Sequence, residues 1–106
     1  MVRIAAINYL NTIPFIYGLE ARMAPGAVAM HFCTPSESAA MLRDDRADVG
    51  IMPVGALGDL ADAHIVSDYC IGATGPVASV LVVSGRPIAE VGEILLDIDS
   101  RTSVLL

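Results

Sequence analysis

The chain has 106 residues, a formal net charge of −6 and 55% hydrophobic residues, against roughly 45–50% in ordinary soluble domains. Its basic residues are all arginines, which excludes a lysine Schiff base and a P-loop, and the acidic balance disfavours binding to the phosphates of nucleic acid. The apolar excess is more than a domain of this size buries alone, so we expect self-association or a larger fold of which this chain is one part.

The first predicted strand, Val2–Ile7, runs directly into a polar loop that includes Asn8, Asn11 and Thr12, and Pro14 follows where a helix should begin. Two interpretations of this loop stay open at the level of local pattern. Thr12 caps the helix while the asparagines bend the loop, or these polar groups face a ligand.

Two more strand-and-helix units follow. Apolar runs at 27–33 and 48–52 predict strands. The sequence from Thr34 to Glu37 has the pattern of a capping box and predicts a helix to about Asp45, and Pro53 opens a shorter helix. This alternation predicts an α/β fold with a doubly wound, mostly parallel sheet. In such a sheet, the loops after the strands share one edge, where helix N-termini attract anions.

The second half of the chain is less regular. A glycine-rich stretch at 72–75 lacks the spacing of a dinucleotide site and predicts a turn that lets the backbone approach a small ligand. The remaining predicted elements are a strand at 77–84, a short helix at 88–92 and a strand at 94–96. Gly85-Arg86-Pro87 ends the first of these strands and is the best candidate for a hinge.

The last predicted element is a helix that begins at Ser100 and stops after about two turns, so we expect the chain to be part of a longer fold. The hydroxyls of Ser100, Thr102 and Ser103 and the guanidinium of Arg101 suit a carboxylate or a phosphate. A plain N-cap at Ser100 with an exposed Arg101 is the alternative.

The chain offers little for metal or nucleophilic chemistry. His31 and Cys33 lie two apart on a predicted strand and face the same side, but no other His or Cys has the spacing of a metal ligand. No Ser-His-Asp arrangement and no distinctive carboxylate pair is present. We expect no metal, no cofactor and no disulfide, with Cys33 and Cys70 both buried as small apolar side chains.

The apolar runs are too short for the roughly 18–20 residues that span a bilayer. The N-terminal segment also lacks the long apolar core and the cleavage site of a signal peptide. We therefore expect a cytoplasmic protein without a membrane partner.

Four segments, in the same order along the chain, resemble the chorismate dehydratases of menaquinone biosynthesis. They are Tyr9-Leu10-Asn11-Thr12, Asp48 to Val54, Gly75 to Val80, and Leu96 to Val104. The resemblance implies a type II periplasmic-binding-protein-like fold whose two lobes close on the substrate, in proteins more than twice this length. Residues 1–85 would then form lobe one, incomplete without a C-terminal return segment, and residues 86–106 the hinge and the beginning of lobe two.

The resemblance also implies a reaction, the loss of water from chorismate to give 3-[(1-carboxyvinyl)oxy]benzoate in the futalosine route. Asn11 and Ser79 correspond to the active-site Asn and Ser of the family, and the run from Ser100 to Ser103 to a second-lobe contact with a substrate carboxylate. Without the resemblance, Ser79 would be interpreted as a core hydroxyl that is hydrogen-bonded to the backbone. The other candidates for substrate binding are Tyr9, Thr12, Thr34, Ser36, Pro53 and Gly75.

Three alternatives remain open. A non-catalytic cytoplasmic binder of a small carboxylate would share the fold and the anion-binding helix starts. The related naphthoate-forming enzyme of the same pathway also shares the fold, although we do not expect Tyr-Leu-Asn-Thr in its first loop. A structural remnant or one half of a swapped dimer is the third, and we expect the 106-residue chain to be inactive alone.

Overall fold

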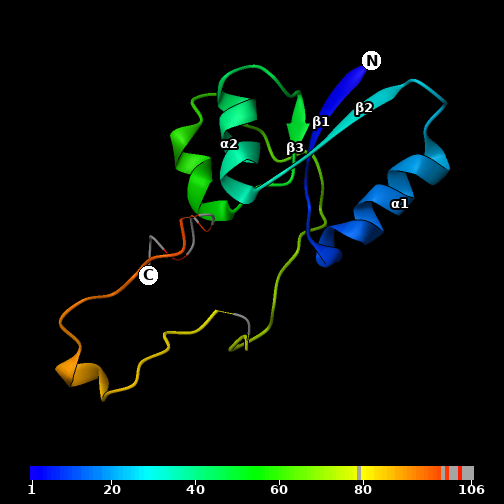
Figure 1. Cartoon of the computed structure of the whole chain (residues 1–106). Coiled ribbons are helices and arrows are strands. Elements are labelled where there is room, and N and C mark those ends of the chain that lie inside the picture. The colour runs from blue at the N-terminus through cyan, green and yellow to red at the C-terminus, as the bar shows by residue number, and fades with distance from the viewer. Residues whose placement is uncertain (79, 99, 101–102, 104–106) are drawn as a thin grey trace.

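The computed structural model describes residues 1–78, 80–98, 100 and 103. Five regular elements come first, namely β1 (Val2–Ile7), α1 (Ile13–Arg22), β2 (Val28–Cys33), α2 (Pro35–Arg43) and β3 (Val49–Gly50) (Figure 1). Three short 3-10 helices are η1 (Leu10–Thr12), η2 (Val54–Asp59) and η3 (Ile88–Glu90). The strands form a parallel sheet in the order β2-β1-β3. The predicted α/β class and the order of strands and helices in the first half are thus confirmed.

The central strand β1 sets the register of the sheet. Ile7 is paired with Cys33 on β2, and Ile4 with Val49 on β3. Because the strands are parallel, their carboxyl ends point to one edge of the sheet. β3 is shorter than the predicted strand at 48–52, although Ile51 N still donates to Ala5 O at 3.1 Å.

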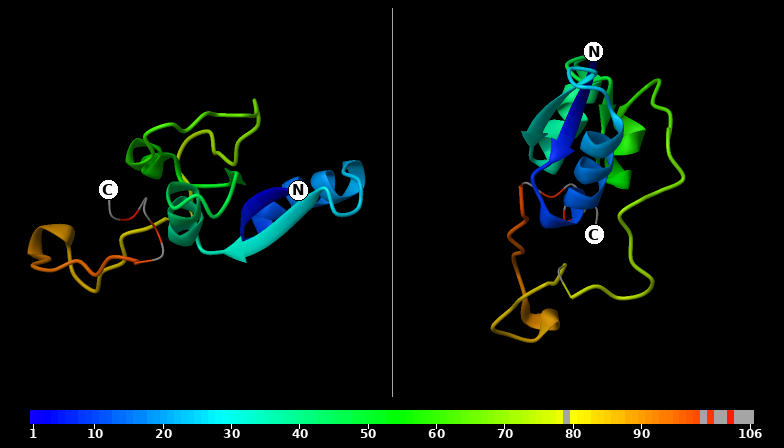
Figure 2. Two further views of the ribbon diagram at one scale, coloured as in Figure 1. Left: turned by 90° about the horizontal axis from the view of Figure 1, so that it is seen from above. Right: turned by 90° about the vertical axis from the view of Figure 1, so that its right-hand side faces the viewer.

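The two longer helices lie on opposite sides of the sheet, as the views in Figures 1 and 2 agree. α2 covers a small core formed by Ala5, Cys33, Met41 and Ala47, against which Leu42 packs. On α1 no residue is fully buried, and Phe15, Ile16 and Leu19 are half-buried. The buried interior therefore lies mainly between β1 and α2.

The approach of α2 to β3 depends on Gly50. A Cβ atom at this position would lie 2.9 Å from Leu42 Cδ1 and 3.0 Å from Ser38 Oγ. Ser38 is fully buried, and its Oγ donates to Ile51 O at 2.7 Å. A side chain at position 50 would therefore disturb both the packing of Leu42 and the bond that holds the end of β3.

We expect Gly50→Ala to lower the free energy of unfolding by about 1 kcal/mol. Overpacking costs typically about 1–3 kcal/mol, which exceeds the gain of about 0.4–1 kcal/mol from restricting the unfolded chain. The matched control is Gly18→Ala on α1, where no atom of the described residues lies within 4 Å of the new Cβ and helix propensity favours alanine. Urea unfolding of both variants checks this, and a Gly50→Ala protein as stable as Gly18→Ala would contradict the close packing.

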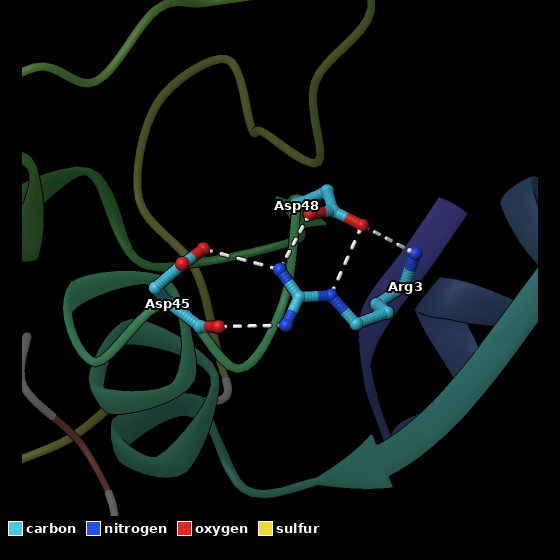
Figure 3. A network of polar contacts seen from close by, with 3 residues as sticks. All are labelled: Arg3, Asp45 and Asp48. Carbon is cyan, nitrogen blue, oxygen red and sulfur yellow. Dashed lines mark hydrogen bonds and ion pairs between the residues drawn. The ribbon is translucent and has the colours of Figure 1, made fainter. Parts of the chain in front are cut away.

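At the amino ends of β1 and β3, Arg3 forms a network with Asp45 and Asp48 (Figure 3). Its Nη2 lies 2.6 Å from Asp48 Oδ1 and its Nε lies 3.2 Å from Asp48 Oδ2, so the contact is bidentate. Its Nη1 donates to Asp45 O at 2.7 Å, and Asp45 has a φ of 53° in the turn after α2. These two carboxylates are therefore paired and join the α2–β3 turn to β1, rather than merely solvating the surface.

This network predicts acid sensitivity. Hydrogen bonds from the side chain of Arg3, and then from its backbone N–H, lower the pKa of Asp48 from 3.8 to about 2. Because the folded-state pKa is below the unfolded one, the stabilisation is present above pH ~4 and is lost as the pH falls towards ~2. We expect Asp48→Asn to have a Tm that changes less over this range than the wild-type Tm.

The control for this comparison is Glu20→Gln, which removes an exposed carboxylate on α1. Its acid response should match that of the wild type. If Asp48→Asn and the wild type lose Tm equally on acidification, the Arg3 network does not stabilise the fold.

The second half of the chain departs from the prediction. The described residues of 77–84 and 94–96 contain no strand, and the short helix predicted at 88–92 is the single turn η3. A strand needs a neighbour to pair with its backbone, and this part of the chain runs away from the sheet (Figure 1). Its apolar side chains are accordingly exposed, Leu81 by 69% and Val83 by 88%.

Two smaller predictions also have an outcome. Among the described residues, no helix combines the length and the apolar character that crossing a membrane requires. Cys33 is buried as expected, but Cys70 is exposed, because it lies in the segment that leaves the sheet. Both cysteines are free.

Candidate functional site

The polar loop after β1 turns sharply at the carboxyl edge of the sheet. Asn8 N donates to Cys33 O at 3.1 Å, Tyr9 N to Ile7 O at 2.8 Å and Thr12 N to Tyr9 O at 3.0 Å. The first bond carries the pairing of β1 with β2 one residue beyond the strands, and the others turn the chain into η1 and α1. The loop is therefore held at the point where β1 and β2 end, beside Thr34.

The side chains of this loop differ in their access to solvent. Asn11 is exposed and Tyr9 is 51% exposed. Thr12 is 0% exposed, and among the described residues its Oγ1 has no hydrogen-bond partner. Thr12 precedes α1, but its side chain accepts no capping bond. The interpretation of Thr12 as a simple helix cap is thus wrong.

The loop after β2 confirms the predicted capping box. Glu37 N donates to Thr34 Oγ1 at 3.3 Å, and Thr34 N donates to Glu37 Oε2 at 2.8 Å. These bonds, the backbone one first, lower the pKa of Glu37. Ser36 Oγ lies 3.4 Å from Thr34 Oγ1. The start of α2 therefore already holds a carboxylate of its own chain.

A hollow of about 230 Å³ lies beside this helix start and is lined by Ser36, Ala39, Ala40, Arg43, Asp59 and Leu60. Ser36 therefore borders the space between α2 and the end of η2.

The loop after β3 is positioned by Ser38, a residue that the sequence analysis missed. Its bond to Ile51 O fixes the backbone just before Met52 and the half-buried Pro53. Pro35, Ser38 and Met41 are the buried residues of α2, and their spacing of three is the signal that places Ser38 on the inner face of the helix. The carboxyl edge of the sheet thus carries three loops, each fixed by backbone hydrogen bonding, capping or this hydroxyl.

Three candidates from the second half of the chain lie among the described residues, namely Gly75, Ser100 and Ser103. Gly75 has a φ of 90° and lies in a bend of the chain at 74–75, within the stretch predicted as a turn. Ser100 Oγ accepts from Ser103 N at 3.2 Å, as the hydroxyl of an N-cap does. Among the described residues, no hydrogen bond joins Gly75, Ser100 or Ser103 to the loop after β1. The predictions for Ser79, Arg101 and Thr102 lie outside the residues that the structure describes.

The chemistry at this edge rests on hydroxyl, amide and backbone groups. Across residues 1–78, 80–98, 100 and 103, no group of three or more His, Cys, Asp or Glu side chains is placed to hold a metal ion. Cys33 Sγ lies 3.7 Å from Ala6 O, and burial raises the pKa of its thiol, whereas His31 is exposed. A buried thiol with a raised pKa is a poor nucleophile.

Comparison with known proteins gives one result. A family model described as menaquinone biosynthesis matches residues 2–106, nearly the whole chain. Searches of curated proteins and of solved structures found no match.

Proposed function

Because this chain belongs to the menaquinone-biosynthesis family, we propose that it forms part of a chorismate dehydratase. The observation that carries the proposal is the exposed Asn11 amide on the tightly held loop after β1. It lies within Tyr9-Leu10-Asn11-Thr12, one of the four segments that resemble the chorismate dehydratases. A fixed loop with an exposed amide suits the orientation of a polar substrate.

The proposed reaction makes modest demands on the protein. The C3–H bond of chorismate breaks, its electrons form the new C3–C4 double bond, and the C4 hydroxyl leaves as water. The proton passes to a weak base, for which the side-chain carboxylate of the substrate is in reach by its own connectivity, and from there to the departing C4 hydroxyl, which leaves as water. Because the product ring is aromatic, the driving force is large. Asn11 would orient the C4 hydroxyl, so that positioning supplies most of the rate enhancement.

The other contacts would come from Ser79, which lies within the proposed lobe one, and from the beginning of lobe two. Ser79 corresponds to the second catalytic residue, and the segment from Ser100 to Ser103 would bind a substrate carboxylate. The bond from Ser103 N to Ser100 Oγ supports a helix start there, and such starts favour anions. Gly85-Arg86-Pro87 remains the proposed hinge between residues 1–85 and 86–106.

We expect Arg101→Ala to raise the KM for chorismate more than it lowers kcat, because a guanidinium that meets a substrate carboxylate acts in binding. Both constants are measured by steady-state kinetics of the two-lobed protein that is assembled from this chain and the complementary C-terminal part of a family member. The control is Arg22→Ala at the exposed end of α1. An unchanged KM in Arg101→Ala would place this arginine outside the site.

The direct test is to incubate the assembled protein with chorismate and to follow the mixture by mass spectrometry. We expect a product lighter than chorismate by one water. Binding without conversion would indicate a non-catalytic carboxylate binder. If chorismate neither binds nor reacts, the proposed substrate is wrong, and the naphthoate-forming step becomes the function to test.

A further inference from the structure

The strand β2 forms one edge of the sheet, and its outer side is unpaired in the described part of the chain (Figure 1). On its inner side, Ala27 O accepts from Val2 N and Cys33 O accepts from Asn8 N. Because every second residue of a strand in a parallel ladder bonds to the same neighbour, the odd-numbered residues of β2 face β1. The backbone N–H and C=O groups of the even-numbered residues therefore point outward. These residues are Val28, Met30 and Phe32.

β2 has none of the features that keep an edge strand from pairing with another chain, which are charged side chains, proline and bulges. Its six residues include no Asp, Glu, Lys, Arg or Pro. Its register with β1 is unbroken from Val28 to Cys33, so it has no bulge. Cys33 is its only buried residue, and Phe32 is 52% exposed. The opposite edge strand, β3, has only two residues, so β2 is the edge that can accept another strand.

We propose that β2 pairs in antiparallel orientation with β2 of a second copy of this chain, about a two-fold axis beside Met30. In this register Met30 lies opposite the same residue of the second copy, and Val28 lies opposite the second copy's Phe32. The residues of each pair exchange N–H···O=C bonds in both directions. A pair of an aromatic and a β-branched side chain also stabilises a sheet. The two sheets of three strands would then form one continuous sheet.

Charge favours both the second copy and the orientation. The chain has a net charge of −6, so two copies repel each other and approach most readily along a strand without charged residues. The nearest charged residues in the sequence are Arg22 before β2 and Glu37 after it. An antiparallel pair brings the Arg22 end of one copy beside the Glu37 end of the other. A parallel pair would instead place like charges at each end, so β2 is complementary to itself in the antiparallel orientation.

The first test is amide hydrogen exchange by NMR, at low and at high protein concentration. The 106-residue chain carries Val83→Lys to reduce association through the exposed segment 81–83. In the monomer, the N–H groups of Ala29 and His31, which face β1, should exchange slowly and the three outward N–H groups fast. In the dimer, the outward groups should exchange at least about tenfold more slowly. Absence of a dimer, or a dimer whose outward N–H groups still exchange fast, would overturn the proposal.

Charge variants at Met30 test the register in the same background. Met30→Lys and Met30→Glu each place like charges opposite each other across the axis, so each should raise the dimer Kd on the order of tenfold. A mixture of the two variants should dimerise at least as tightly as the parent chain. The matched controls are Tyr17→Lys and Tyr17→Glu, at a position that is 72% exposed on α1, and they should dimerise like the parent.

Slow exchange of Ala29 and His31 shows that a variant keeps the sheet. If the variants at Met30 do not fold, Phe32→Lys, at a more exposed position, should weaken the dimer instead. Protected outward N–H groups without recovery in the mixture would mean that another segment, such as 80–84, occupies the edge, and would overturn the pairing of β2 with itself. None of these outcomes depends on the proposed function, because chorismate is absent throughout.

Discussion

Replacing Asn11 by alanine should lower kcat/KM for chorismate at least about tenfold, a loss of ~1.4 kcal/mol of transition-state stabilisation. The amide is exposed at the carboxyl edge of the sheet, so its removal costs little packing. The backbone of the loop is held by Asn8 N to Cys33 O and Thr12 N to Tyr9 O, bonds that the substitution leaves in place. The fold should therefore survive while the chemistry fails.

The comparison needs the thermal melt and the kinetics of the same preparation. Tyr17→Ala is the matched control, because Tyr17 is 72% exposed on α1 and has no part in the proposed site. It should keep wild-type activity. A well-folded Asn11→Ala protein with ordinary turnover would remove the loop after β1 from the active site.

The second large effect concerns the 106-residue chain by itself, which should self-associate and show no measurable dehydration of chorismate. Leu81, Val82 and Val83 are 69%, 67% and 88% exposed, and an exposed apolar segment of this kind favours association. β2, at one edge of the sheet, has six residues and offers its free backbone groups to a strand from a second copy. Under the proposed function, activity would need both lobes around the substrate.

Sedimentation velocity at micromolar concentration measures the association. Val83→Lys, which places a charge in the exposed segment, should shift the chain towards monomer. A wild-type chain that is monomeric and melts cooperatively would contradict the exposed apolar surface. Adding the complementary C-terminal part of a family member should restore dehydration, and turnover by the short chain alone would contradict the need for two lobes.

Local sequence rules predicted the first half of the fold well. The predicted strand Val2–Ile7 is β1 with the predicted bounds, and the Thr34–Glu37 pattern is a complete capping box. Both depend on neighbours within a few residues. The close approach at Gly50 and the role of Ser38 depend on the packing of α2 over β3, which no local pattern encodes.

The less accurate predictions have the same origin. The segment at 77–84 has strong strand propensity, but β-propensity largely expresses packing against neighbouring strands, and the described residues show none beside it. Thr12 has the residue type and the position of an N-cap, yet its hydroxyl is buried and has no hydrogen-bond partner among the described residues. The whole fold determines whether a side chain such as that of Thr12 is buried and which partner it has. Thr12 also lies in the candidate site.

The most direct test of the proposed function is the proton NMR spectrum of chorismate incubated with the assembled two-lobed protein. Elimination of water predicts that the ring-diene signals are replaced by aromatic signals while the enolpyruvyl methylene signals persist in equal amount, and that Asn11→Ala slows this change. A spectrum that stays that of chorismate, or aromatic signals accompanied by loss of the enolpyruvyl group, would contradict it.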